Sequence, residues 1–341
     1  MEAYDDLILI FIACLSAFAF SMLIAPPVIK RMGMLKAGQP ILKYLEHHNA
    51  KSGTPTMGGL IFIIPTVFIT LALAYNRISL VAVTVTAGYG ILGFLDDFIK
   101  VRLKRNEGLK PYQKVMGQLG IAVIASLFAY GSGEIGSAVK IPFSTSEINL
   151  GMWVVPLSVF LFVAVTNSVN LTDGIDGLSG SSGAIATAAT SAAAFFYYSE
   201  AAHYGLTAEA EGLFSLALFS GVSACSLLGF LWNNVHPSKI FMGDTGSLAL
   251  GGSIAAATVF MRNPLLAGIV CVVYAWSSVS VILQVVYFRL TKKQKRLFGM
   301  SPFHHHLELK GYSETQITAF YTVITAAAAL VGLISVIMNL N

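Results

Sequence analysis

Four polar clusters interrupt an otherwise apolar chain, and their side chains are of the types that handle metal ions and phosphates. The clusters are Asp96-Asp97, Asp173 with Asp176, Asp244, and His304-His305-His306. Carboxylates bind hard divalent cations, and imidazoles accept or donate protons near neutral pH. The clusters fall in alternate gaps between long apolar stretches. If those stretches cross a membrane, all four clusters emerge on the same side and can form one site.

The composition indicates a membrane protein. Of 341 residues, 55% are hydrophobic and only 11% are charged, whereas a soluble domain carries roughly twice that share of charge. We expect ten spans of about 20 residues each, the fourth and eighth of which are short. The predicted spans are residues 7–29, 57–75, 78–95, 115–130, 152–169, 178–198, 213–232, 248–261, 265–288 and 317–340.

The distribution of basic residues predicts the orientation. Of the 21 Lys and Arg residues, all but Arg77, Lys140 and Arg262 lie in the gaps that follow odd-numbered spans. Because cytoplasmic loops are enriched in Lys and Arg, these gaps are predicted to be cytoplasmic and both termini to lie outside. The acidic start, with Glu2, differs from the basic start of a cleaved signal peptide.

We therefore expect one all-α transmembrane domain over residues 1–341, with its active site on the cytoplasmic face. The loops expected to form that site are 30–56, 96–114, 170–177, 233–247 and 289–316. A secondary transporter is the rival from another class. Transporter acids usually lie near the middle of the membrane on broken helices, whereas these acids lie at span ends.

Asp96 and Asp97 end the third predicted span, and Lys100 follows one turn later. Adjacent carboxylates diverge on a helix, so they can line two sides of a magnesium site. Lys100 can share their surface at a spacing of three or four residues and balance phosphate charge. The alternative is a solvated helix end with an ordinary ion pair.

Two further predicted loops contain acids beside glycines. Residues 170–177 read NLTDGIDG, which fits either two Asp-Gly turns, with Asp176 capping the next helix, or a ligand site that includes Asn170 and Asp173. Residues 241–247 read FMGDTGS. There Asp244 or Thr245 could cap a helix, or Asp244 could hold a cation while the helix start faces phosphate oxygens.

Two more inner segments carry residues suited to phosphate contacts. His304-His305-His306 follow a basic run that could also rest on anionic lipid headgroups. Neighbouring histidines diverge, so one or two of them suit phosphate or proton handling better than a shared metal. Lys51 and Thr56 enter the second span in the segment KSGTPTMGG and offer phosphate or base contacts. With Lys100 and Lys114, this set contains the side chains that phosphoryl transfer needs: acids that can bind a divalent cation or act as a base, and lysines that draw two anions together.

These motifs resemble those of the polyprenyl-phosphate N-acetylhexosamine-1-phosphate transferases. The resemblance covers about residues 51–311 and includes the Asp-Asp pair, the 170–177 loop and Gly243-Asp244. Two segments are specific to a smaller branch of this superfamily: GTPTMGG at 53–59 and SPFHHHLELKG at 301–311. They resemble the phospho-N-acetylmuramoyl-pentapeptide transferases, because relatives that use other sugars typically have an interrupted histidine motif.

The resemblance implies an Mg²⁺-dependent reaction in a bacterial plasma membrane. The phosphate of undecaprenyl phosphate would attack UDP-MurNAc-pentapeptide and form lipid I and UMP for peptidoglycan synthesis. The alternative reaction is transfer of a different sugar phosphate, such as GlcNAc-1-phosphate, to the same kind of lipid phosphate. The resemblance also implies contact with membrane lipids and a homodimer. We expect no nucleic acid partner.

The resemblance also implies roles for individual residues. Asp96 would act as base or partner of the lipid phosphate, Asp244 as the chief Mg²⁺ ligand, and Asp97 as its support. Lys114 and the three histidines would engage phosphates or the sugar. The residues expected to contact the uridine diphosphate are Lys51, Asn170, Asp173, Asp176, Asn234 and Phe241.

Overall fold

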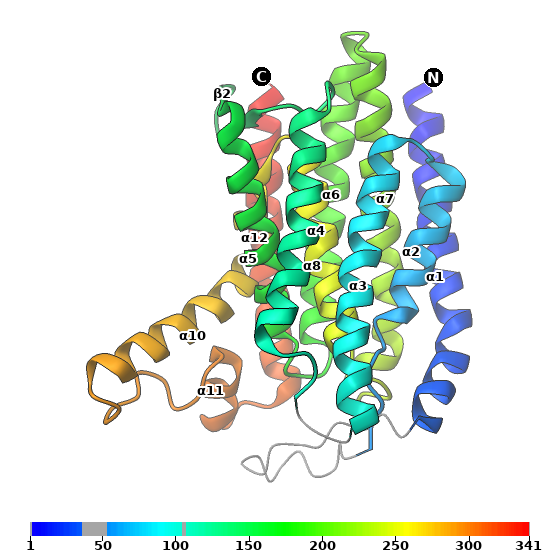
Figure 1. Cartoon of the computed structure of the whole chain (residues 1–341). Coiled ribbons are helices and arrows are strands. Elements are labelled where there is room, and N and C mark those ends of the chain that lie inside the picture. Colours follow the sequence, from blue (N-terminus) through cyan, green and yellow to red (C-terminus); the bar gives the residue numbers. More distant parts are fainter. Residues whose placement is uncertain (1, 36–52, 104–106, 341) are drawn as a thin grey trace.

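Long helices build almost the whole molecule (Figure 1). The computed structural model describes residues 2–35, 53–103 and 107–340. Its helices are α1 (Glu2–Met34), α2 (Leu60–Leu73), α3 (Arg77–Leu103), α4 (Pro111–Gly131), η2 (Gly151–Trp153), α5 (Val154–Thr172), α6 (Leu178–His203), α7 (Thr207–Asn234), α8 (Gly243–Phe260), α9 (Pro264–Val270), α10 (Val272–Leu290), α11 (Phe303–Leu309) and α12 (Glu314–Leu340). The strands β1 (Ala138–Lys140) and β2 (Glu147–Asn149) form one antiparallel hairpin.

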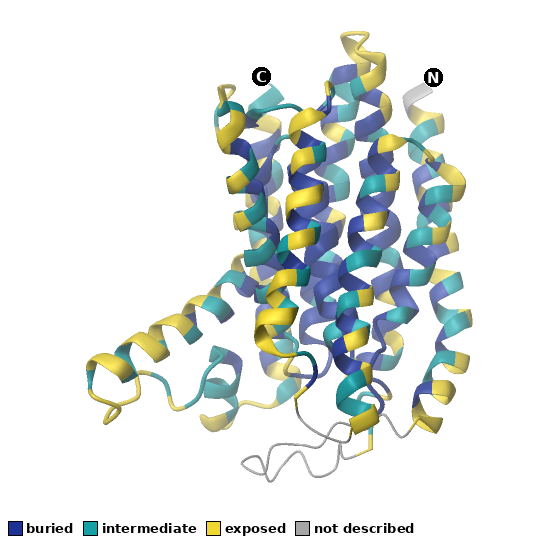
Figure 2. Ribbon diagram, viewed as in Figure 1, coloured by how far each residue is buried: buried dark blue, intermediate teal, exposed yellow. Residues whose placement is uncertain are grey.

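The predicted all-α membrane protein is confirmed. Within the described residues, seven helices are long and apolar enough to cross a membrane: α1, α3, α4, α5, α7, α10 and α12. Large apolar side chains such as Phe11, Leu15 and Val323 are exposed on the outer helices, and the interior is buried (Figure 2). A surface of this kind is favourable in lipid. The count of ten spans and the orientation in the membrane stay predictions.

Helix α8 forms the centre of the bundle. Every residue of it except Asp244 is buried, and it packs mainly against α3 and α5. Glycines allow the close approach at its first turn. A Cβ at Gly93 of α3 would lie 2.0 Å from the Asp244 carbonyl oxygen, and one at Gly59 would lie 2.2 Å from the Gly246 Cα. Small residues let helices approach closely in lipid, and here they bring the end of α3 against the start of α8.

The two ends of the bundle differ. The amino and carboxyl termini lie at the same end (Figure 1). The end of α3, the start of α4 and helix α11 lie at the other end. This arrangement gathers the described parts of the five predicted inner loops.

The ninth predicted span is wrong as a single helix. Cys271 ends α9 and precedes α10 with φ −99° and ψ 18°, a sparsely populated backbone region that interrupts a helix. Beyond the break, α10 leaves the bundle at an angle, with α11 beside it (Figure 1). The second predicted span also differs, because α2 has only 14 residues. The short fourth and eighth spans extend to 21 residues in α4 and 18 in α8.

Candidate active site

Three carboxylates meet at the end of the bundle opposite the termini, the predicted cytoplasmic end, and we call Asp96, Asp97 and Asp244 the acidic centre. One oxygen of each lies within 4.8 Å of the others. Asp96 and Asp97 are buried in the last turns of α3, and the Asp244 side chain is 15% exposed at the start of α8. Hard oxygen ligands at this spacing suit a divalent cation such as Mg²⁺.

Two lysines balance the acidic centre. Asp244 Oδ2 lies 2.8 Å from both Lys100 Nζ and Lys114 Nζ. Lys100 Nζ also lies 2.6 Å from Asp96 Oδ2, at the predicted spacing of one helical turn. Lys114 is held by the start of α4, where Pro111 occupies a position that suits proline because its missing N–H is not needed. The two ammonium groups therefore come from different helices to one carboxylate oxygen.

Asp97 has a second role, as the cap of α8. Its Oδ2 accepts hydrogen bonds from the backbone N–H (2.9 Å) and the hydroxyl (2.8 Å) of Thr245, and its Oδ1 accepts from Asp244 N (3.2 Å). Neither Asp244 nor Thr245 caps the helix, so that alternative was wrong. Because the first amides of a helix need acceptors and favour negative charge, a carboxylate from α3 stabilises the start of α8.

The charge of Asp244 is strongly stabilised. Burial by itself would raise its pKa, but hydrogen bonding with Asp96 and the nearby Lys114 and Lys100 ammonium groups hold that pKa well below its usual range. Asp244 is therefore ionised at neutral pH.

The last turn of α5 and the loop that follows it lie beside the acidic centre. Asn170 Nδ2 donates to Asp244 Oδ1 (2.6 Å) and to Ser247 Oγ (2.8 Å). Desolvation raises the pKa of Asp173 well above its usual range, and the Asp244 and Asp97 carboxylates add to that effect. Asp173 therefore binds a proton more readily than an aspartate in water.

Asp176 belongs to a different cluster, which we call the Asp176 group: Asp176, His236 and Glu314. Asp176 Oδ2 accepts from Ser238 N (3.1 Å) and lies 3.0 Å from His236 Nδ1, while Oδ1 accepts from the Ser238 hydroxyl (2.9 Å). Glu314 accepts from Asp176 N (3.3 Å). The prediction that Asp176 caps the next helix was wrong, because Gly177 at φ +74° starts α6 without a side-chain cap. The Asp176 carboxylate instead joins two loops.

Asn234, Phe241 and Thr56 lie where three segments meet. Buried Asn234 accepts from Gly177 N (3.2 Å) and donates to the Ile240 carbonyl (2.9 Å). The Phe241 backbone pairs with the segment around Thr56, since Phe241 N donates to the Pro55 carbonyl at 2.8 Å. The Thr56 hydroxyl is buried and has no hydrogen-bond partner within the described part of the chain. It faces Gly243, where a Cβ would lie 2.5 Å from Thr56 Oγ1 and from Asp97 Oδ2.

The three histidines separate into two groups. A Cβ on Gly174 would lie 2.5 Å from His304 Nε2 and 3.2 Å from His305 Nε2, so these two rings reach the loop after α5. His305 Nδ1 lies 2.5 Å from Glu308 Oε2. Burial, and then the neighbouring His305, hold the pKa of His304 well below its usual range. His306 instead packs near Phe298 and accepts from Gly299 N (3.1 Å).

The structure thus brings together most of the residues singled out from the sequence, in two adjacent groups. Lys51 lies outside the described residues. His236, Ser238 and Glu314 were missed. The segment His236-Pro237-Ser238 stands between Asn234 and Phe241 in a predicted inner loop, and a histidine at that place was the available signal. Glu314 lies near the end of the predicted inner loop 289–316, where nothing in the sequence marked it.

Comparison with known proteins identifies the family of the chain. Residues 78–262 match the family model for glycosyl transferase family 4, and residues 51–63 match the phospho-N-acetylmuramoyl-pentapeptide-transferase signature 1. A phospho-N-acetylmuramoyl-pentapeptide-transferase of Clostridium novyi is 41% identical over 95% of each chain. Proteins of the same name from Clostridium botulinum (42%, 95% of each chain) and Thermoanaerobacter sp. (41%, 96% of this chain and 98% of the other) are equally similar. The chain therefore belongs to the phospho-N-acetylmuramoyl-pentapeptide-transferase family.

Proposed function

We propose that this protein transfers phospho-MurNAc-pentapeptide from UDP-MurNAc-pentapeptide to undecaprenyl phosphate, forming lipid I and UMP in a bacterial plasma membrane. The observation that carries the proposal is the acidic centre, with its two lysines, at the inner end of an apolar bundle. A lipid phosphate lies at the level of the headgroups, where these helix ends are expected. The names of the relatives and the signature at residues 51–63 support the same reaction.

Mg²⁺ fits the acidic centre. The ligand set consists of carboxylate oxygens, which this ion prefers, and Mg²⁺ usually binds one or two carboxylates together with substrate phosphates. Asp244 would hold the ion as its chief ligand, supported by Asp97, and Asp96 lies within reach of the same point. When bound, the cation neutralises phosphate charge and polarises a phosphoryl oxygen.

The acceptor phosphate would bind beside Asp96 and Lys100. Asp96 would keep the lipid phosphate ionised, and Lys100 and Lys114 would offset the repulsion between two anionic substrates. An oxygen of the lipid phosphate bonds to the β-phosphorus of the donor. The bond from that phosphorus to the UMP oxygen breaks, and UMP leaves. An ionised phosphate is already a competent nucleophile, so this route needs no covalent enzyme intermediate.

The donor would lie across the loop after α5. Asn170, in the last turn of α5, donates to Asp244 of the acidic centre, and Asp176, in the loop that follows, accepts from Ser238. Asp173 between them, with its raised pKa, can approach a diphosphate as a neutral carboxyl group. Other donor contacts would come from Lys51, the unpartnered Thr56 hydroxyl, Asn234 and the Phe241 ring, while His304 and His305 would reach the sugar phosphate.

UMP release by the purified protein in detergent tests the proposal. The assay contains Mg²⁺, undecaprenyl phosphate and either UDP-MurNAc-pentapeptide or UDP-GlcNAc, with Asp244→Asn as control. We expect release with the pentapeptide donor alone and none in the variant. Release with UDP-GlcNAc alone would keep the chemistry but overturn the donor. Release from neither donor by folded protein would overturn the enzyme assignment.

The homodimer is a separate part of the proposal, based on the family alone. The mass of the detergent-solubilised protein tests it directly. A particle containing two chains supports it, and a single chain at all protein concentrations contradicts it.

A further inference from the structure

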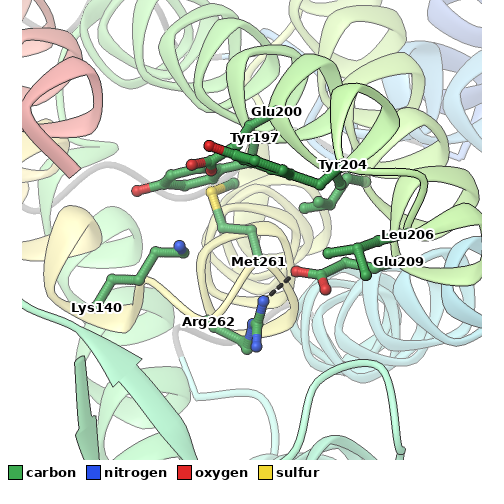
Figure 3. Close-up of a pocket in the computed structure, with 10 residues that line it drawn as sticks. Lys140, Tyr197, Glu200, Tyr204, Leu206, Glu209, Met261 and Arg262 are labelled. Carbon is green, nitrogen blue, oxygen red and sulfur yellow. Dashed lines mark hydrogen bonds and ion pairs between the residues drawn. The ribbon is translucent and has the colours of Figure 1, made fainter. Parts of the chain in front are cut away.

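A second polar cavity lies at the other end of the bundle, far along the helices from the acidic centre. It has a volume of about 200 Å³, smaller than the roughly 300–1,000 Å³ of most drug-sized ligand sites. Its polar walls come from β1, the end of α6, the start of α7 and the end of α8 (Figure 3). The side chains that matter here are Lys140, Tyr197, Glu200, Tyr204, Glu209 and Arg262.

Both cations of this cavity are already paired. Lys140 Nζ lies 3.1 Å from Glu147 Oε1 and 4.5 Å from the centre of the Tyr197 ring. Arg262 forms an ion pair with Glu209. These are two of the three basic residues predicted to lie outside. The proposed reaction at the inner end uses neither of them.

Glu200 is the acid of this cavity that forms neither of these ion pairs. Among the described residues its carboxylate has no hydrogen-bond or ion-pair partner, although Glu200 is only partly exposed. In Figure 3 it lies on the same wall as Tyr197 and Tyr204, across the cavity from Lys140 and Arg262. A carboxylate that is partly shielded from water is stabilised by a nearby cation. The Tyr197 ring already contacts Lys140, and the Tyr204 ring can add favourable contact with an organic ammonium group. The size of the cavity suits a small amine better than a sugar nucleotide.

We propose that this cavity binds a primary ammonium group on Glu200, between Tyr197 and Tyr204. The group can come from a small soluble amine or from the headgroup of an aminophospholipid at the outer membrane surface. In the second case the lipid phosphate would lie toward Lys140 and Arg262. The binding step is an ion pair, without covalent change.

Native mass spectrometry of the full chain, released from nanodiscs with equal amounts of phosphatidylethanolamine and phosphatidylcholine, tests the proposal. The two headgroups differ only in methylation of the ammonium group. We expect about tenfold more phosphatidylethanolamine adduct on the wild type, a preference of about 1.4 kcal/mol. Only the primary ammonium group can donate N–H hydrogen bonds to the Glu200 carboxylate, so Glu200→Gln should abolish the preference. Glu211→Gln, an exposed acid outside this cavity, is the matched control.

Calorimetric titration with ethanolamine separates the two sources. Saturable binding of ethanolamine that Glu200→Gln removes would identify a soluble amine, and selective retention of the lipid alone would identify the headgroup. The proposal is overturned if the wild type shows neither, or if Glu200→Gln retains its preference. UMP release by Glu200→Gln, expected to equal that of the wild type, verifies folding independently because the inner site is untouched.

Discussion

The acidic centre and the Asp176 group each bring three potential metal ligands within 4.8 Å, yet their surroundings differ. In the acidic centre, three carboxylates face two lysine ammonium groups from separate helices. In the Asp176 group, the carboxylate of Asp176 accepts from the backbone and hydroxyl of Ser238 and lies against His236. The first group concentrates charge, whereas the second joins loops.

This difference teaches that a cluster of acids does not by itself identify a reaction centre. Lysines that contact carboxylates in the free protein can move to substrate phosphates when a cation replaces them at the carboxylates, so that no buried charge is left unpaired. Hydrogen bonds between loops cannot be exchanged in that way without loosening the site. We therefore assign the chemistry to the acidic centre and the shape of the donor pocket to the Asp176 group.

The largest expected effect is that of Asp244→Asn. The change keeps the shape of the side chain but removes the charge that two lysines and the cation share. We expect UMP release to fall by at least about 10³-fold, comparable to removal of a central electrostatic contact. The measurement is the initial rate at saturating donor. A loss of less than tenfold in folded protein would contradict the role of Asp244.

Lys114→Met should have the second-largest effect. We expect UMP release to fall by about 10²-fold, because one of the two ammonium groups at the reacting phosphates is removed. Lys110→Met is the matched control, since Lys110 lies one turn earlier and is exposed. Equal losses in both variants would show that only the general basic charge of this helix start matters.

Asp176→Asn should act mainly on donor binding. It weakens the contacts with Ser238 and His236, so we expect the KM for the donor to rise about tenfold, equivalent to 1–2 kcal/mol of hydrogen bonding, with kcat changed less. Full steady-state kinetics separate the two parameters. If kcat fell as far as in Asp244→Asn, the division of labour between the two groups would be wrong.

The smallest expected effect is that of His304 on the pH dependence of folding stability. Burial holds its folded-state pKa well below the ordinary histidine pKa of about 6.5, so the unfolded chain binds the proton more readily. His304 therefore leaves stability unaffected above about pH 6.5 and lowers it as pH falls from there toward the folded-state pKa. Thermal unfolding at pH 7.5 and pH 5.5 should show a smaller decrease in Tm for His304→Asn than for the wild type. An equal decrease would contradict this.

Local features of both groups could be predicted from the sequence. Helix geometry fixes the spacing of Lys100 from Asp96, so the prediction that they share one surface is confirmed by their contact. Features that depend on distant segments could not be predicted. Asp97 caps a helix 147 residues away, whereas a sequence pattern suggests caps only from adjacent residues. The break at Cys271 carries no local proline or glycine pair, so the apolar pattern looked continuous.

The most direct test of the central claim is an electron paramagnetic resonance titration with Mn²⁺, which suits the same oxygen ligands as Mg²⁺. It compares the wild type with Asp244→Asn and Asp176→Asn. We predict one site in the wild type, its loss in Asp244→Asn and its retention in Asp176→Asn. Loss of the site only in Asp176→Asn would move the cation to the other group and contradict the assignment of the chemistry to the acidic centre.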